Sequence, residues 1–184
     1  DHELTYSLVC GRRDLGSMTV KESFRVLCSF LIDAYRNLGL DAAFALDLLP
    51  SDRSIGVKTV HCFAGKEPYD ILVGGRKLGG NAQRRLGDLV FQHGSIPLTL
   101  DLSRQRGLFH PRALPPEGSA TAHYDELARA AAAGGTAAAF PAPEALFALL
   151  EDSFAERMGI AWEEGGLTAE ERERAEELAS RKYR

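Results

Sequence analysis

The chain has 184 residues, of which 45% are hydrophobic and 26% charged, values typical of one folded domain with a sizeable core. Its net charge of −4 and pI near 5.8 argue against general nucleic-acid binding, which usually requires a basic surface. No apolar run approaches the roughly twenty residues that a membrane helix needs, so we expect no membrane association. Three cysteines, without paired metal-type spacing, predict reduced thiols, no metal site and a cytoplasmic setting.

The first part of the chain predicts a strand followed by a long helix. Residues 4–9 contain the Thr, Tyr and Val typical of strands. A helix is expected over about 20–38, because apolar residues recur there at helical spacing. Thr19 and Glu22 form a capping box at its start, and Gly39 is a stop signal at its end.

The middle of the chain predicts short strands. Residues 43–49 are expected to form one, and 69–73 and 76–78 a hairpin joined by the turn Gly74-Gly75. Residues 89–100 are rich in Val, Phe and Ile and predict a further strand.

The last part of the chain predicts helices. Residues 101–118 contain three prolines and are expected to be a linker, followed by an alanine-rich helix over 124–133. A further helix is expected from Pro143 to Met158. The last begins at Thr168, which forms a second capping box with Glu171. Early strands and late helices predict an α+β fold, with 119–184 as the helical C-terminal part of a single domain, 1–184.

Three residues within about thirty positions suit covalent acyl chemistry. Cys62 supplies a thiol that can carry an acyl group, and the Lys77 ammonium can stabilise the oxyanion that forms during its transfer. His93 lies on the next predicted strand. Taken alone, Cys62 is better explained as a buried structural cysteine than as a nucleophile, and a lone strand histidine is more often a core residue.

Two motifs carry a resemblance to a known family: Gly75-Arg76-Lys77-x-x-Gly80-x-Ala82-Gln83 and Gln92-His93-Gly94-Ser95-Ile96. Further matching segments are residues 1–7, 35–42 and 178–183. Together they resemble the biotin/lipoate A/B protein ligase family, and most closely its cysteine-dependent octanoyl-carrier-protein:protein octanoyltransferases. The similarity spans essentially the whole chain. It implies a mixed β-sheet flanked by helices.

The resemblance also implies site residues. The octanoyltransferases have a cysteine-phenylalanine pair at Cys62-Phe63, and their cysteine accepts the octanoyl group; Lys77 is then the second catalytic residue. The expected substrate-binding residues are Gly79, Gly80, Asn81, Ala82, His93, Gly94 and Ser95. For His93, pocket lining and a purely structural role remain open.

A basic cluster that includes Lys77 stands out in this acidic chain. Its members Arg76, Arg84 and Arg85 form either a docking patch or a solvated strand end. The docking interpretation follows from charge, because acyl carrier proteins and lipoyl domains are typically acidic and opposite charges speed encounter.

The expected function is that of an octanoyltransferase, an acyltransferase of lipoate biosynthesis. It would move an octanoyl group from acyl carrier protein through a cysteine thioester to the lysine of a lipoyl domain or glycine-cleavage H protein, without a cofactor. The alternative is an ATP-dependent lipoate–protein ligase that forms a lipoyl-adenylate, with Asp70 helping to hold magnesium. Gly80-Asn81-Ala82 is ligase-like, whereas Cys62-Phe63 and Tyr69 favour the transferase. A third reading is a non-catalytic subunit that needs a complementary chain.

Family members have an N-terminal portion ahead of the segment matched by Asp1. It contains an Arg-Arg-x-Thr-Gly-Gly loop and a His-Asp pair, of which Asp1 would be the acid. We therefore expect this chain to lack that portion, whose loop is expected to wall the acyl pocket.

Overall fold

A computed structural model describes residues 3–48, 66–99, 107, 110, 123–127 and 141–182. Cys62, nearly all of the expected linker and most of the expected alanine-rich helix lie outside these ranges. Within them, the α+β class with sheets flanked by helices is confirmed. Every described strand pair is antiparallel. None of the described helices combines the length and apolar character that crossing a bilayer requires.

The larger sheet has the strand order β1-β6-β5. Strand β1 (Glu3–Gly11) and strand β6 (Leu89–Pro97) pair along their whole length, and β5 (Gly80–Leu86) pairs on the other side of β6. The expected strands over 4–9 and 89–100 are confirmed as β1 and β6, whereas β5 was not expected. A short 3-10 turn, η1 (Arg12–Leu15), follows β1.

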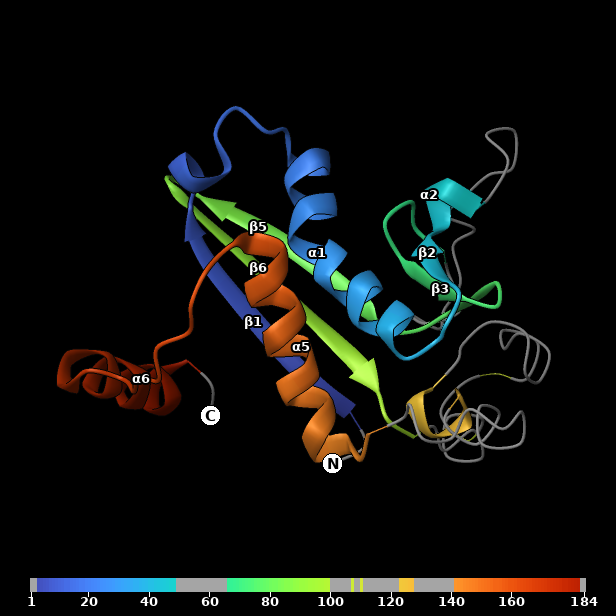
Figure 1. Cartoon of the computed structure of the whole chain (residues 1–184). Helices are drawn as coiled ribbons and strands as arrows, with labels where there is room; N and C mark the ends of the chain where they lie inside the picture. The colour runs from blue at the N-terminus through green and yellow to red at the C-terminus, as the bar shows by residue number, and fades with distance from the viewer. Residues whose placement is uncertain are drawn as a thin grey trace.

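Two helices cover the same face of this sheet (Figure 1). Helix α1 (Val20–Asn37) begins at Thr19, whose Oγ1 accepts from the Glu22 amide at 3.3 Å while its own amide donates to Glu22 Oε2 at 2.7 Å. Helix α5 (Pro143–Met158) packs on α1 and ends at Gly159. Both expected helices are confirmed. Because α1 contacts α5 as well as the sheet, Phe30 is buried on the side of α5, where its ring packs edge-on against Phe154 with centroids 5.2 Å apart.

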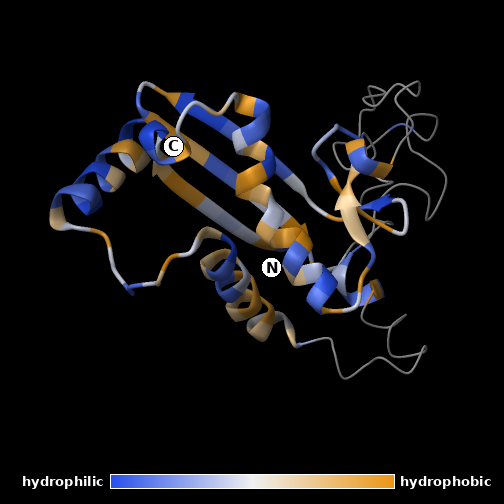
Figure 2. Cartoon of the chain, turned by 45° about the horizontal axis from the view of Figure 1, so that its top comes forward, coloured by the Kyte–Doolittle hydropathy of each residue, from blue (hydrophilic) through white to orange (hydrophobic). Residues whose placement is uncertain are grey.

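The smaller sheet has the order β2-β3-β4 and lies beyond the end of α1 (Figure 1). Strands β2 (Ala42–Phe44) and β3 (Ile71–Val73) consist of buried apolar residues, as the hydropathy colouring of this sheet also shows (Figure 2). β4 (Arg76–Lys77) completes the expected hairpin. The strand expected over 43–49 is wrong after Phe44, because α2 (Ala45–Leu48) follows β2 directly.

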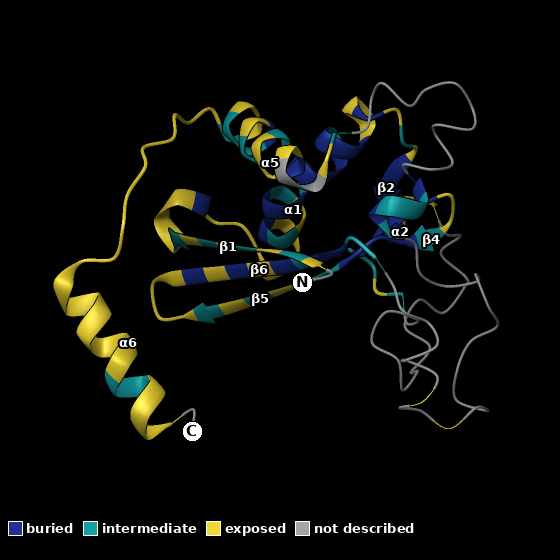
Figure 3. Cartoon of the chain, turned by 90° about the horizontal axis from the view of Figure 1, so that it is seen from below, coloured by how far each residue is buried: buried dark blue, intermediate teal, exposed yellow. Residues whose placement is uncertain are grey.

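The last helix, α6 (Ala169–Arg181), extends away from the sheet and its two covering helices (Figure 3). It begins at Thr168 with the expected capping box to Glu171, which confirms the predicted start. None of its described residues is buried. The core is formed by α1, α5 and the larger sheet together with the buried strands β2 and β3 of the smaller sheet, and α6 contributes no buried residue to it.

Candidate active site

A pocket of about 590 Å³ opens where the two sheets meet. The first turns of α1, the turn before β3, strand β4 and the adjoining parts of β5 and β6 all contribute to its wall. The lining residues are Lys21, Phe24, Glu67, Pro68, Tyr69, Asp70, Lys77, Gly80, Asn81, Ala82, His93 and Ser95. Six residues expected from the sequence thus line one cavity: Lys77, Gly80, Asn81, Ala82, His93 and Ser95.

Lys77 reaches the pocket from the β3–β4 hairpin. The turn uses Gly74 (φ 56°) and Gly75 (φ 75°), left-handed conformations that suit the twist of a two-residue hairpin. Lys77 is 6% exposed, and its Nζ lies 2.8 Å from Asp70 Oδ2. A buried ammonium is costly unless it is paired, so this carboxylate stabilises the charge at the pocket wall.

Asp70 is itself held on several sides. Its Oδ2 also accepts from the Glu67 amide at 2.7 Å, and its carbonyl accepts from the Ala45 amide at 2.8 Å. These two contacts fix the Asp70 carboxylate and backbone independently of Lys77. The ammonium therefore occupies a position set by the small sheet, and not a mobile surface position.

Gly79 and Gly94 support the pocket without lining it. Gly79 has φ +89°, and a Cβ there would lie 2.5 Å from the Ser95 carbonyl oxygen. Residues with a Cβ rarely adopt that backbone conformation, and the Ser95 carbonyl leaves no room for one. Both the conformation and the close approach therefore favour glycine. The chain can thus turn tightly from β4 into β5. Lys77 at the end of β4 and Gly80 and Asn81 at the start of β5 therefore line the same pocket.

His93 lies on the exposed face of β6 at the pocket wall. Its ring stacks on Phe91, with centroids 6.1 Å apart and an interplanar angle of 14°. The structure places His93 on the pocket wall and in a stacking contact with Phe91, so pocket lining and a structural role both stay predictions. Ser95, two residues further on, donates to Glu3 Oε2 at 2.6 Å and faces the same pocket.

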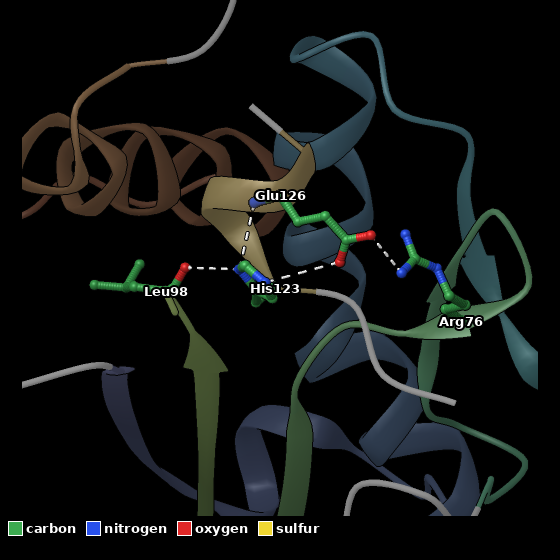
Figure 4. Close-up of polar contacts among 4 residues, drawn as sticks. All are labelled: Arg76, Leu98, His123 and Glu126. Carbon is green, nitrogen blue, oxygen red and sulfur yellow. Dashed lines mark hydrogen bonds and ion pairs between the residues drawn. The ribbon is translucent and has the colours of Figure 1, made fainter. Parts of the chain in front are cut away.

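The three arginines of the basic cluster point to different places. Arg76 pairs with Glu126, whose Oε1 lies 2.5 Å from Arg76 Nη1, and Glu126 in turn contacts His123 (Figure 4). Arg85 donates to Ser23 Oγ at 2.9 Å and to the Met18 carbonyl at 3.1 Å. Arg84 is exposed. Arg84 is therefore exposed to solvent, whereas Arg76 and Arg85 form intramolecular contacts.

The two described cysteines are poor nucleophiles. Cys28 is fully buried on α1, and burial raises the pKa of its thiol to about 12. Burial, followed by the charge of Asp14, also raises the pKa of Cys10. Both thiols stay protonated near neutral pH, and a thiol reacts as its thiolate. The role expected for Cys62 lies outside the described residues and rests on its sequence context.

Sequence reasoning missed how two residues serve the site. Asp70 was expected only as a magnesium ligand of the ligase alternative, and Tyr6 only as part of the first strand. Tyr6 in fact donates to Asn81 Oδ1 at 2.7 Å. These partners are separated by 75 positions, so no local pattern in the sequence signals their contact.

Comparison with known proteins identifies related sequences. A family model described as the lipoyl protein ligase A/B catalytic domain matches residues 1–126. An octanoyltransferase LipM of Kyrpidia tusciae is 36% identical over 188 residues, covering 98% of this chain and 66% of the relative. The LipM of Geobacillus kaustophilus is 33% identical and covers 100% of this chain and 66% of the relative. The chain thus spans slightly less than two thirds of these relatives.

Solved structures share the fold. A lipoate-protein ligase A bound with ATP superimposes with a TM-score of 0.70 and 21% identity, covering 99% of this chain and 62% of that one. A putative lipoate protein ligase from T. acidophilum with bound lipoic acid gives 0.68 and 20%, with 99% and 62% coverage. At this level of identity, these structures establish a common architecture.

Proposed function

This chain belongs to the lipoyl protein ligase A/B catalytic-domain family, and on that premise we propose that it acts as a protein octanoyltransferase. The observation that carries the proposal is the pocket that presents Lys77 on its wall, in a chain 33–36% identical to two LipM octanoyltransferases along nearly its whole length. The donor would be octanoyl-acyl carrier protein. The acceptor would be the lysine of a lipoyl domain or glycine-cleavage H protein.

In the first half-reaction, the Cys62 thiolate attacks the carbonyl carbon of the carrier thioester. The carbonyl oxygen becomes an oxyanion, which the Lys77 ammonium stabilises. The carbon–sulfur bond to the carrier then breaks, and the carrier leaves as a thiol once protonated. The product is octanoyl-Cys62. Because one thioester replaces another, this step needs no ATP.

In the second half-reaction, the neutral amine of the acceptor lysine attacks the same carbonyl carbon. The bond to Cys62 breaks, an amide forms, and the amine proton returns the cysteine to its thiol form. Lys77 would stabilise this second oxyanion from the same position, since Asp70 holds it in place. A fixed donor suits both steps because the carbonyl oxygen occupies the same site in each.

The ligase alternative assigns Asp70 to magnesium. In this structure Asp70 Oδ2 already accepts from Lys77 and from the Glu67 amide. An ion bound to that oxygen would compete with Lys77, so the contacts of Oδ2 support an ammonium partner there. We therefore retain the transferase as the proposal and let the experiment below separate the two.

The test is intact-mass spectrometry after mixing the protein with octanoyl-acyl carrier protein and no ATP. We expect a hydroxylamine-sensitive octanoyl adduct that maps to Cys62 and disappears in Cys62→Ala. Cys10→Ser is the matched control and should keep the adduct, because burial already raises the pKa of that thiol. Acceptor modification that requires both lipoate and ATP, with no adduct, would overturn the proposal in favour of a ligase.

A further inference from the structure

Three residues form one row across the larger sheet. In the strand register, Tyr6 of β1 lies opposite Gly94 of β6, and Gly94 lies opposite Asn81 of β5. The row faces α1, because the Tyr6 ring packs edge-on against Phe30 with centroids 5.4 Å apart. Across this row, the Tyr6 hydroxyl donates to Asn81 Oδ1 at 2.7 Å. A side chain of β1 thus bonds a side chain of β5 directly over the intervening strand.

Gly94 makes this contact possible. A Cβ at this position would lie 2.2 Å from Asn81 Oδ1 and 2.4 Å from Tyr6 Cε1, far inside van der Waals contact. Gly94 is not among the glycines with positive φ, so its backbone conformation does not require glycine. The requirement is one of space. The glycine of the His93-Gly94-Ser95 motif therefore leaves the space in which Tyr6 and Asn81 form their hydrogen bond.

The contact decides which end of the Asn81 amide is free. Because Oδ1 accepts from Tyr6, the Nδ2 group is left to donate elsewhere, and it has no protein acceptor within the described part of the chain. Asn81 lines the pocket together with Lys77. Burial raises the pKa of Tyr6 above its ordinary value, so its hydroxyl keeps the proton that it donates.

We propose that Tyr6 is a positioning residue that orients Asn81 so that Nδ2 donates to the carbonyl oxygen of the bound acyl group. Lys77 and Asn81 then form a two-donor site, with the ammonium held by Asp70 and the amide held by Tyr6. The identity of the ligand as an acyl carbonyl rests on the proposed function. Two donors fixed before the substrate arrives need no reorganisation when the oxyanion forms.

The test measures binding, so it does not depend on turnover. The probes are an octanoyl-pantetheine analogue with an amide in place of the thioester, and a matched analogue with CH₂ in place of the carbonyl. Calorimetry should show that Tyr6→Phe raises the Kd of the carbonyl analogue roughly threefold to tenfold, the loss expected for one hydrogen bond. The Kd of the CH₂ analogue should not change. In an Asn81→Ala background, Tyr6→Phe should have no further effect on either Kd.

Tyr35→Phe is the matched control. The Tyr35 hydroxyl is buried and has no hydrogen-bond partner among the described residues. Removing it is the same chemical change in the same core, and neither Kd should move. Thermal melts of the wild type and both variants would show whether folding differs between them.

Each outcome bears on the proposal. Equal weakening of both analogues, or weakening of neither, by Tyr6→Phe would overturn the positioning role, as would an effect that persists without Asn81. A wild type that shows the Tyr6 dependence but transfers no octanoyl group would overturn the octanoyltransferase alone. A wild type that forms the Cys62 adduct without the Tyr6 dependence would overturn only the positioning role. Failure of the wild type to bind the carbonyl analogue, together with no octanoyl adduct at Cys62, would overturn both.

Discussion

Lys77 Nζ lies 2.8 Å from Asp70 Oδ2, and both side chains are 7% exposed. The pair joins the two ends of a hairpin, because Asp70 directly precedes β3 and Lys77 ends β4. One partner faces the pocket as a candidate catalytic group, and the other fixes where it stands. The charge of Lys77 therefore bears on catalysis and on stability. Substituting Lys77 tests the first role, and substituting Asp70 tests the second.

Removing the Lys77 charge should slow acyl transfer. We expect Lys77→Met to lower the single-turnover rate of Cys62 acylation by about 10²–10³, the typical loss of one oxyanion donor. The affinity for the carrier protein should change far less, because the ammonium acts on the oxyanion. Rapid-quench measurement of octanoyl-enzyme formation gives this rate. A rate within a factor of three of the wild type would remove Lys77 from the mechanism.

Removing only the carboxylate should damage stability. Asp70→Ala removes the carboxylate that lies 2.8 Å from the buried Lys77 ammonium, and breaking a buried pair typically costs about 3–5 kcal/mol. The double variant Asp70→Ala/Lys77→Met should recover part of this loss, because no uncompensated charge remains. Urea denaturation gives the free energies of unfolding. If the double variant is as unstable as the sum of the single variants, the pair does not couple as the geometry indicates.

Gly79 offers a test of the tight turn into β5. Gly79→Ala should destabilise the fold by about 1–3 kcal/mol, because it combines a left-handed backbone with a Cβ placed 2.5 Å from the Ser95 carbonyl oxygen. Gly87→Ala is the control, since its φ is +56° but no atom lies within 4 Å of the added Cβ. The control should therefore cost less in the same urea experiment. Equal losses would show that the approach to Ser95 does not constrain residue 79.

Cap signals and apolar periodicity predicted α1, α5 and α6 because their determinants are local. Thr19 and Thr168 each bond within one turn of their own helix, so three residues of sequence reveal the start. Strand β5 escaped prediction because Gly80–Leu86 is mostly small or polar and lies at the sheet edge, with no alternation of apolar residues. Its structure comes from pairing with β6, a contact that local sequence does not encode.

The candidate site divides in the same way. The motifs predicted that Lys77, Asn81 and His93 belong together, and the structure places all three on one pocket. What each side chain bonds depends on residues distant in sequence or across a strand. The direction of the Asn81 amide follows from Tyr6 on another strand, and the dispersal of the arginines follows from Ser23 and Glu126. Such contacts are fixed by tertiary packing.

Stability should depend on pH through Cys28. Its folded-state pKa is raised from 9.0 to about 12 by burial, so above pH 9 the unfolded chain loses a proton that the folded chain keeps. The unfolded state is then favoured, and the free energy of unfolding should fall as pH rises from about 9 towards 12. Urea denaturation between pH 8 and about 9.3, below the ordinary tyrosine pKa of 10.0, should show a shallower fall for Cys28→Ala. Identical slopes would mean that this thiol ionises freely in the folded protein.

Charge reversal at Arg84 and at Arg85 should have different effects, the first on binding of a partner protein and the second on stability. Arg84 is exposed, so Arg84→Glu should raise the apparent KM for an acidic carrier or acceptor protein by roughly twofold to tenfold at low salt, with a smaller effect at high salt. Arg85 bonds Ser23 and the Met18 carbonyl, so Arg85→Glu should instead lower the melting temperature. Arg172→Glu on the projecting α6 is a control of equal charge change. Steady-state kinetics over a salt series would exclude docking at Arg84 if both exposed variants behave alike.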